Sequence, residues 1–112
     1  METNGSGSIG FSQPVIPIFK GECYEFWSIK MKTLFRSQDL WDLVETGFNK
    51  NEADEGHLRE NKKKDSKALF FLQQAVDDTI FSRIAMASTS KEGWETLQKE
   101  FMGSSKVKAR VG

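Results

Sequence analysis

Few side chains in this sequence could do catalytic or metal chemistry. The chain contains one histidine, His57, and one cysteine, Cys23. A metal site needs three or four ligands, and a catalytic triad needs a nucleophile, a base and an orienting group, so these two residues supply neither. The adjacent acids Asp77 and Asp78 stand at an expected helix start, where carboxylates stabilise the helix dipole, and this position predicts capping. The sequence therefore predicts a protein that is not an enzyme and that binds no cofactor and no metal.

The strongest cluster of basic residues could instead contact the phosphates of a nucleic acid. It consists of Arg59, Lys62, Lys63, Lys64 and Lys67. On a helix, Arg59, Lys63 and Lys67 are spaced i, i+4 and i+8, so they share one face that could neutralise phosphate charge. A solvated helix face is the simpler interpretation, because no aromatic residues interleave with the cluster and 16 basic and 16 acidic residues give a net charge of zero.

Length and composition predict one folded domain. With 112 residues, of which 38% are hydrophobic and 12% aromatic, the chain can form a modest core. It has no apolar run of the roughly 20 residues that a membrane span needs, and its first residues, METNGSGSIG, do not read as a signal peptide. One cysteine cannot form a disulfide within the chain, which favours a reducing compartment. We therefore expect a cytoplasmic protein without membrane contact.

The elements that must position these residues are predicted to be helices. Apolar residues recur at steps of three and four, which predicts helices over about 22–36, 38–46, 56–75, 77–85 and 91–102, with a loop over 47–55. Ser37 is expected to cap the start of the second helix and Gly47 to end it, and Thr89 with Glu92 forms a capping box before the last. The fold class is therefore all-α, a small bundle of about five helices preceded by an extended, proline-containing N-terminal segment. Residues 1–13 are expected to form a flexible tail, 14–103 the helical domain, and 104–112 the truncated start of a following element.

The segment from Pro14 to Phe19 is expected to be extended, because two prolines in six residues forbid a helix. Its apolar residues, including Ile16 and Ile18, would anchor it to another apolar surface. Docking onto its own domain is the favoured outcome. Pairing with a partner, or leaving a groove open for a peptide, are the alternatives.

Several aromatic residues are candidates either for the core or for an interface. Tyr24 and Trp27 lie on one face of the first helix, where core packing is favoured over a groove for a partner, and Phe26 is expected to widen that face. Phe70 and Phe71 are adjacent and cannot share a helix face, so one is expected in the core and the other in a second contact or an interface. The predicted protein or peptide interface comprises Ile16, Ile18, Phe19, Tyr24, Trp27, Phe70 and Phe71.

Residues 19–31, FKGECYEFWSIKM, resemble the N-terminal motif F-x-G-x-N-Y-x-x-W-x-x-x-M of copia-type Gag polyproteins, which are abundant in plant genomes. The matching residues are Phe19, Gly21, Tyr24, Trp27 and Met31. Cys23 departs from the motif, which has Asn at that place. Residues 40–44, 67–74 and 90–101 also resemble the family, in the same order and spacing.

The resemblance implies a structural protein that assembles into virus-like particles around the RNA of a retrotransposon. We accordingly expect a capsid-like domain whose partners are further copies of itself, with RNA contact through the basic cluster as a minor part. The rival hypothesis is a Gag-derived host module that captures a peptide or protein in a groove beside Trp27. A third is a nucleic-acid binder acting through Lys62, Lys63 and Lys64. The chain could be a fragment of a polyprotein, a truncated copy or a domesticated gene.

Overall fold

The computed structural model describes residues 15–102, and this part of the chain forms five α-helices followed by a short π-helix, without strands. They are α2 (Tyr24–Ser37), α3 (Trp41–Thr46), α4 (Glu55–Gln74), α5 (Asp78–Ile84), α6 (Ser90–Leu97) and the π-helix η2 (Gln98–Met102). The predicted all-α fold of about five helices is confirmed. The predictions for the tail over 1–13 and for the element over 104–112 lie outside the described residues.

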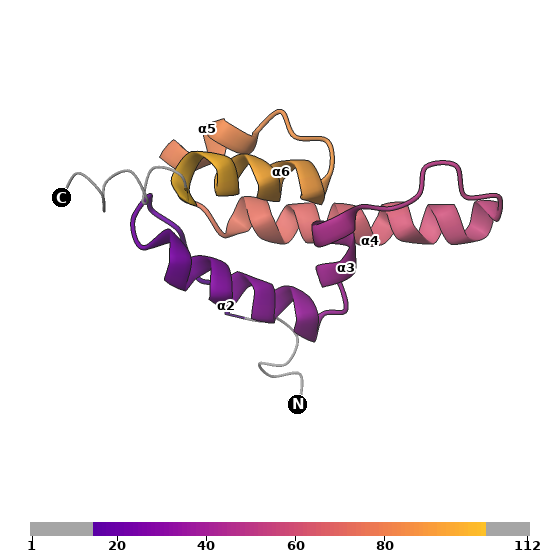
Figure 1. Cartoon of the computed structure of the whole chain (residues 1–112), viewed down its shortest axis with the longest axis horizontal. Coiled ribbons are helices and arrows are strands. Elements are labelled where there is room, and N and C mark those ends of the chain that lie inside the picture. Colours follow the sequence, from indigo (N-terminus) through magenta and orange to yellow (C-terminus); the bar gives the residue numbers. More distant parts are fainter. Residues whose placement is uncertain (1–14, 103–112) are drawn as a thin grey trace, which may run out of the picture.

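The long helix α4 is the axis of the domain, with α6 packed along one side of it and α3 crossing near its middle (Figure 1). Its N-terminal half extends beyond the other helices. Only Asp65, Ala68 and Leu72 of α4 are buried, and all three belong to its second half. The core therefore lies over the C-terminal half of α4.

The core face of α2 follows the helical period. Tyr24, Trp27, Met31, Leu34 and Phe35 are buried. The expectation that Phe26 widens this face is wrong, because 69% of its surface is exposed. Phe26 lies one position before Trp27, which is about 100° round the helix and turns its side chain away from the core.

Side chains cap the starts of three helices. Asp54 accepts a hydrogen bond from the His57 N–H at the start of α4, and Asp77 accepts one from the Ile80 N–H at the start of α5, each over 3.1 Å. The predicted capping role of Asp77 is confirmed, and the hydrogen bonds from Thr79 and Ile80 lower the pKa of its carboxyl group.

The predicted capping box is present in a modified form. Thr89 Oγ1 accepts from the Glu92 N–H over 3.1 Å at the start of α6. The carboxylate of Glu92 reaches one residue further back than in the usual box, and accepts from the backbone N–H of Ser88 over 2.9 Å. Hydrogen bonds from Ser88 also lower the pKa of the Glu92 carboxyl group.

The prediction that Ser37 caps the second helix is wrong. Ser37 is the last residue of α2, and its Oγ donates to the carbonyl of Leu34 over 2.7 Å. A turn follows in which Asp39 has a φ of 62°, and α3 then begins after Leu40 without a side-chain cap. The helix α3 ends before Gly47, as predicted, and Gly47 has a φ of 79°, a positive value that glycine adopts without strain.

The last predicted helix, 91–102, is divided between two kinds of helix. The α-helical hydrogen bonds end at Leu97 and η2 continues the chain to Met102. Close packing sets the position of α6, because a Cβ atom on Gly93 would lie 2.9 Å from Cδ2 of the buried Leu72 in α4. A glycine at this place therefore allows α6 to approach α4.

Candidate protein interface and basic helix face

The N-terminal segment docks onto its own domain, as the sequence favoured. The Phe19 N–H donates to the carbonyl of Ala75 over 2.8 Å, and the Asp77 N–H donates to the carbonyl of Phe19 over 3.1 Å. These bonds make an isolated parallel bridge to the junction between α4 and α5. The indole N–H of Trp27 also donates to the carbonyl of Pro17 over 3.1 Å. The groove predicted beside Trp27 is therefore filled by the chain itself.

Three of the predicted interface residues instead form the centre of an aromatic core. The rings of Phe19 and Trp27 are stacked with centroids 4.9 Å apart, and Tyr24 packs edge-on against Phe19 at 5.6 Å. The stack continues to Trp94 of α6, 5.7 Å from Trp27. The exposed fractions of Phe19, Tyr24 and Trp27 are 1%, 2% and 5%. The core packing favoured for Tyr24 and Trp27 is therefore confirmed, and Phe19 is buried with them instead of being available to a partner.

Burial also changes the chemistry of Tyr24. Its hydroxyl group is buried and has no hydrogen-bond partner among residues 15–102. An ionised phenolate would lose its hydration there without compensation. Burial accordingly raises the pKa of Tyr24 to about 12.

The other four predicted interface residues divide into two pairs. Ile16 and Phe71 are half-buried and pack against the core. Ile18 and Phe70 expose 48% and 55% of their surfaces. The expectation that one of the two adjacent phenylalanines faces the core therefore holds, and Phe71 is that residue. Ile18 and Phe70 lie on different elements, the N-terminal segment and α4.

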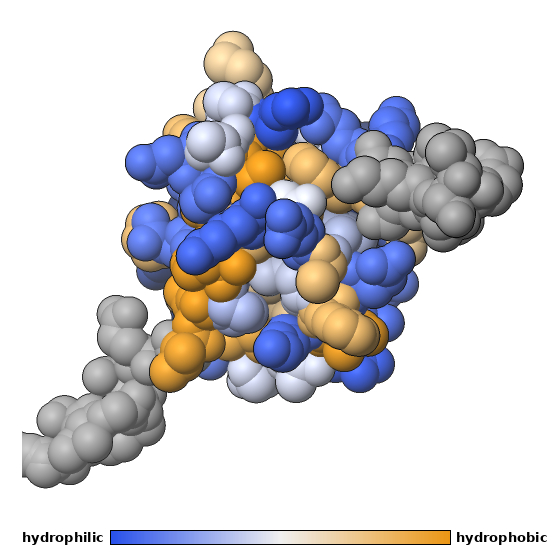
Figure 2. Space-filling view, turned by 90° about the vertical axis from the view of Figure 1, so that its left-hand side faces the viewer, coloured by the Kyte–Doolittle hydropathy of each residue, from blue (hydrophilic) through white to orange (hydrophobic). Residues whose placement is uncertain are grey.

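A larger apolar surface, which the sequence did not indicate, lies on the outer face of α2. Phe26 and Ile29 expose 69% and 63% of their surfaces and are one helical turn apart. Val15, of which 93% is exposed, helps to line a shallow groove between the N-terminal segment and α2. That groove is lined by Val15, Pro17, Lys30, Thr33, Leu34 and Ser37. Hydrophobic side chains line one edge of the face seen in Figure 2, with hydrophilic residues around them. The i, i+3 spacing of Phe26 and Ile29, opposite the core stripe, was the signal that could have revealed this surface.

The predicted basic cluster lies on the outer surface of α4. Arg59, Lys62, Lys63 and Lys67 are exposed. Lys64 lies apart from them, since its Nζ is 3.9 Å from a carboxylate oxygen of Asp39. Phe70 follows Lys67 by three positions and Lys63 by seven, so an exposed aromatic ring ends the basic row. No aromatic residue interleaves with the cluster over 59–67, as the sequence shows, but Phe70 stands just beyond its C-terminal end.

Asp65, which interrupts the apolar face of α4, has a structural role that the sequence did not predict. It is 4% exposed, and its Oδ1 accepts from the hydroxyl and the N–H of Ser90 over 2.6 and 3.2 Å. Ser90 itself is fully buried at the first position of α6. The carboxylate thus ties α4 to the N-terminus of α6.

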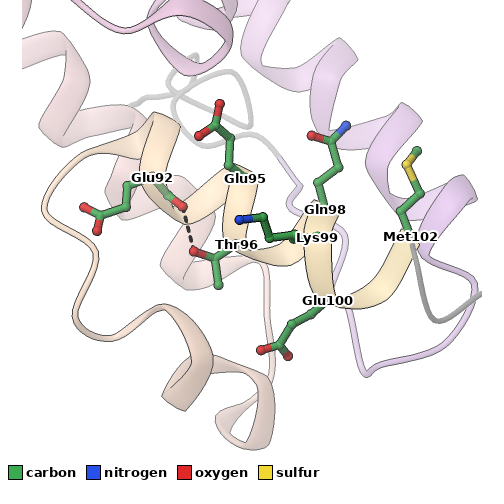
Figure 3. A pocket seen from close by; sticks show the side chains of 7 residues that line it. All are labelled: Glu92, Glu95, Thr96, Gln98, Lys99, Glu100 and Met102. Atoms are coloured by element: carbon green, nitrogen blue, oxygen red, sulfur yellow. Dashed lines mark hydrogen bonds between the residues drawn. The ribbon is translucent and has the colours of Figure 1, made fainter.

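The helix surface drawn in Figure 3 does not form a site. Its side chains come from α6 and η2 and point in different directions, with Glu95 and Gln98 on one side and Glu100 on the other. Glu100 is paired with Arg83 and Glu95 with Lys91. Residues 15–102 contain no group of three or more His, Cys, Asp or Glu residues that could hold a metal ion. In the same range, no helix is both long and apolar enough to cross a membrane.

Residues 15–102 thus form a helical domain with an exposed apolar face on α2 and an exposed basic face on α4. No polar side chains in this range were found to converge on a common site. The family model "gag-polypeptide of LTR copia-type" matches residues 31–111. The chain therefore belongs to the copia-type Gag family of retrotransposons, whose Gag domains are generally non-catalytic. The matched range begins inside α2 and includes α3 to η2, so it is independent of most of the motif over 19–31. No curated protein and no solved structure was found to match the chain.

Proposed function

We propose that this chain is a non-enzymatic structural domain of a copia-type Gag protein that associates with further copies of itself in a cytoplasmic particle. One observation carries the proposal. Phe26 and Ile29 on α2 stay exposed although the domain closes its own core around Trp27, and Val15 stays exposed at the groove between the N-terminal segment and α2. Clustered large apolar side chains on a folded domain mark contact surfaces.

A weak contact is sufficient for such a role. Each contact in a particle is repeated many times, so the effective concentration of neighbours multiplies a modest pairwise affinity. Two or three apolar side chains of this size can supply several kcal/mol when they are buried, at about 1.5–3 kcal/mol each. Part of that energy is offset by the loss of freedom on association.

RNA contact through α4 is a second and subordinate proposal. The exposed row of Arg59, Lys63 and Lys67 presents positive charge along α4, from its projecting N-terminal half into its second half, and Phe70 adds a ring on which a base could stack. Binding of a single-stranded RNA should weaken steeply as salt is raised, and replacing Lys63 and Lys67 with Gln should lower the salt slope. A salt-independent affinity would contradict this proposal.

The alternative, a host module that captures a peptide or protein, loses the feature on which it was based, because residues 15–19 occupy the groove beside Trp27. The experiment that separates the two is the mass of the purified domain in solution, measured by light scattering over a range of concentrations at low and high salt. Concentration-dependent growth that persists at high salt supports self-association through apolar surface. A strict monomer at all concentrations would contradict it.

A further inference from the structure

We propose that the outer face of α2 is the self-association surface, and that it pairs antiparallel with α2 of a second copy about a two-fold axis. The inference rests on the proposed function and specifies its partner surface. A two-fold contact must be self-complementary, because the same patch serves on both sides. The outer face of α2 meets this condition in the order of its end charges, with Glu25 in the first turn and Arg36 in the last.

The apolar residues stand on the N-terminal half of the face. Phe26 lies in the first turn of α2, which spans Tyr24–Ser37, and Ile29 lies in the second turn, just before the centre of the helix. Glu25 precedes them and Arg36 follows them, so the acidic group lies toward one end and the basic group toward the other. Among residues 15–102 neither Glu25 nor Arg36 takes part in an ion pair. A helix with this order of charges repels a parallel copy and attracts an antiparallel one.

A register centred between Ile29 and Lys30 brings the apolar residues of the two copies together and also pairs their opposite charges. It places the two Ile29 side chains near the axis and Phe26 opposite Thr33 of the second copy. Position 36 then lies opposite position 23, about 3 Å along the axis from Glu25 of the second copy. Glu25 and Arg36 are also about 20° apart round the helix, so they lie on the same flank of the contact.

The groove beside α2 gives Phe26 a place to insert. Thr33 and Leu34 form one wall of the groove, and Val15 and Pro17 form the other. Phe26 leans toward this side of α2, because Lys30 and Leu34 follow it at steps of four. In the proposed register the ring of Phe26 from each copy enters the groove of the other. Each ring is thereby buried against Val15, which is 93% exposed in the single chain.

Charge exchange provides the sharpest experiment. We would prepare Glu25→Lys and Arg36→Glu as separate proteins and measure association by analytical ultracentrifugation, singly and mixed. Each variant alone places like charges at both copies of the contact. The mixture restores two opposite pairs, Lys with Glu and Glu with Arg. We expect each single variant to weaken association by about tenfold or more and the equimolar mixture to recover it as a heterodimer.

The apolar part is tested with Phe26→Ser and with the matched control Phe70→Ser, which removes an exposed phenylalanine from α4 instead. We expect Phe26→Ser to weaken association by about tenfold or more and Phe70→Ser to leave it unchanged. Circular dichroism should show the same fold in all variants.

The results separate this inference from the proposed function. If the wild-type domain associates but neither Phe26→Ser nor the charge variants weaken it, the α2 contact is refuted while self-association stands. If Phe70→Ser alone abolishes association, the surface is on α4. If the wild-type domain stays monomeric at every concentration, the inference and the proposed function both fail.

Discussion

The buried hydroxyl group of Tyr24 predicts a specific response of the protein to alkaline pH. Tyr24 is the one tyrosine of the chain, so its ionisation can be followed without interference from another phenol. Burial raises its pKa to about 12, from an ordinary value of 10.0. In the folded protein the phenolate should therefore form only at strongly alkaline pH.

The sign and size of the effect on stability follow from this difference. Below about pH 10 the phenol is neutral in both states and its ionisation does not affect the free energy of unfolding. As the pH rises above 10, the unfolded chain ionises while the folded chain cannot. The folded state therefore loses stability progressively until the pH reaches the folded pKa of about 12. Because one pKa unit corresponds to about 1.4 kcal/mol, the loss attributable to Tyr24 approaches about 3 kcal/mol.

The assay compares wild type with Tyr24→Phe. Urea unfolding at a series of pH values gives the free energy of unfolding of each, and the difference between the two proteins removes the contribution of lysines that titrate in the same range. Tyr24→Phe should keep or slightly raise stability at neutral pH, by up to about 1 kcal/mol, because it removes a buried hydroxyl group without a partner. The wild type should then fall below the variant as the pH is raised.

Ultraviolet absorbance of the phenolate tests the premise directly. Ionisation should occur well above pH 10 and together with unfolding. A gradual titration near pH 10 in a protein that is still folded would refute the reasoning, since it would mean that water reaches the hydroxyl group. Equal pH dependence of wild type and Tyr24→Phe would refute it as well.

Three further predictions concern stability measured by urea unfolding at neutral pH. Gly93→Ala should lower the free energy of unfolding by about 1–2 kcal/mol because its Cβ would crowd α4, whereas the matched change Gly56→Ala, on an exposed helix start with ordinary contacts, should be neutral or raise it by up to about 1 kcal/mol. Asp65→Ala should cost about 2–4 kcal/mol because it strands the buried N–H and hydroxyl group of Ser90, and a double-mutant cycle with Ser90→Ala should show strong coupling. Cys23→Asn should raise stability by about 0.5–1 kcal/mol because the backbone there has a φ of 57°, a left-handed conformation that Asn tolerates better than most residues.

Each of these predictions has an outcome that would contradict it. Equal effects of alanine at the two glycines would show that helix propensity, and not contact with α4, decides the result. Additive effects of the Asp65 and Ser90 substitutions would mean that their hydrogen bond does not hold α6. A loss of stability in Cys23→Asn would mean that the cysteine side chain makes a favourable contact that outweighs the backbone preference.

Local signals in the sequence were sufficient for the helices and for several of their ends. Asp77 and Thr89 were predicted as caps because a cap uses only neighbouring backbone groups. The prediction that Ser37 caps a helix was wrong because local signals allow a serine two roles. A serine can serve as a cap or close a turn with the carbonyl three residues back, and the turn through Asp39 that follows α2 selected the second.

The amphipathic period also separated core from surface only in part. It placed Tyr24 and Trp27 on one face, which the structure buries. The period could not show that Phe26 lies outside the core face, because the limits of that face depend on which other elements pack against α2. For Phe70 and Phe71 the sequence required a division between core and surface, and the packing of α4 determined that Phe71 is the inner residue.

The sequence by itself determined the all-α class, the approximate helices and the family, because each depends on local periodicity or on motif spacing. Only the tertiary structure decided which apolar residues remain outside and what the N-terminal segment does. Phe19 bonds to Ala75 and Asp77, more than fifty positions along the chain, and Asp65 holds Ser90 across 25 positions. Such pairings depend on how α4 and α6 pack, which no local pattern specifies. The exposed face of α2 follows from the same packing, since it is the surface left over when the core is complete.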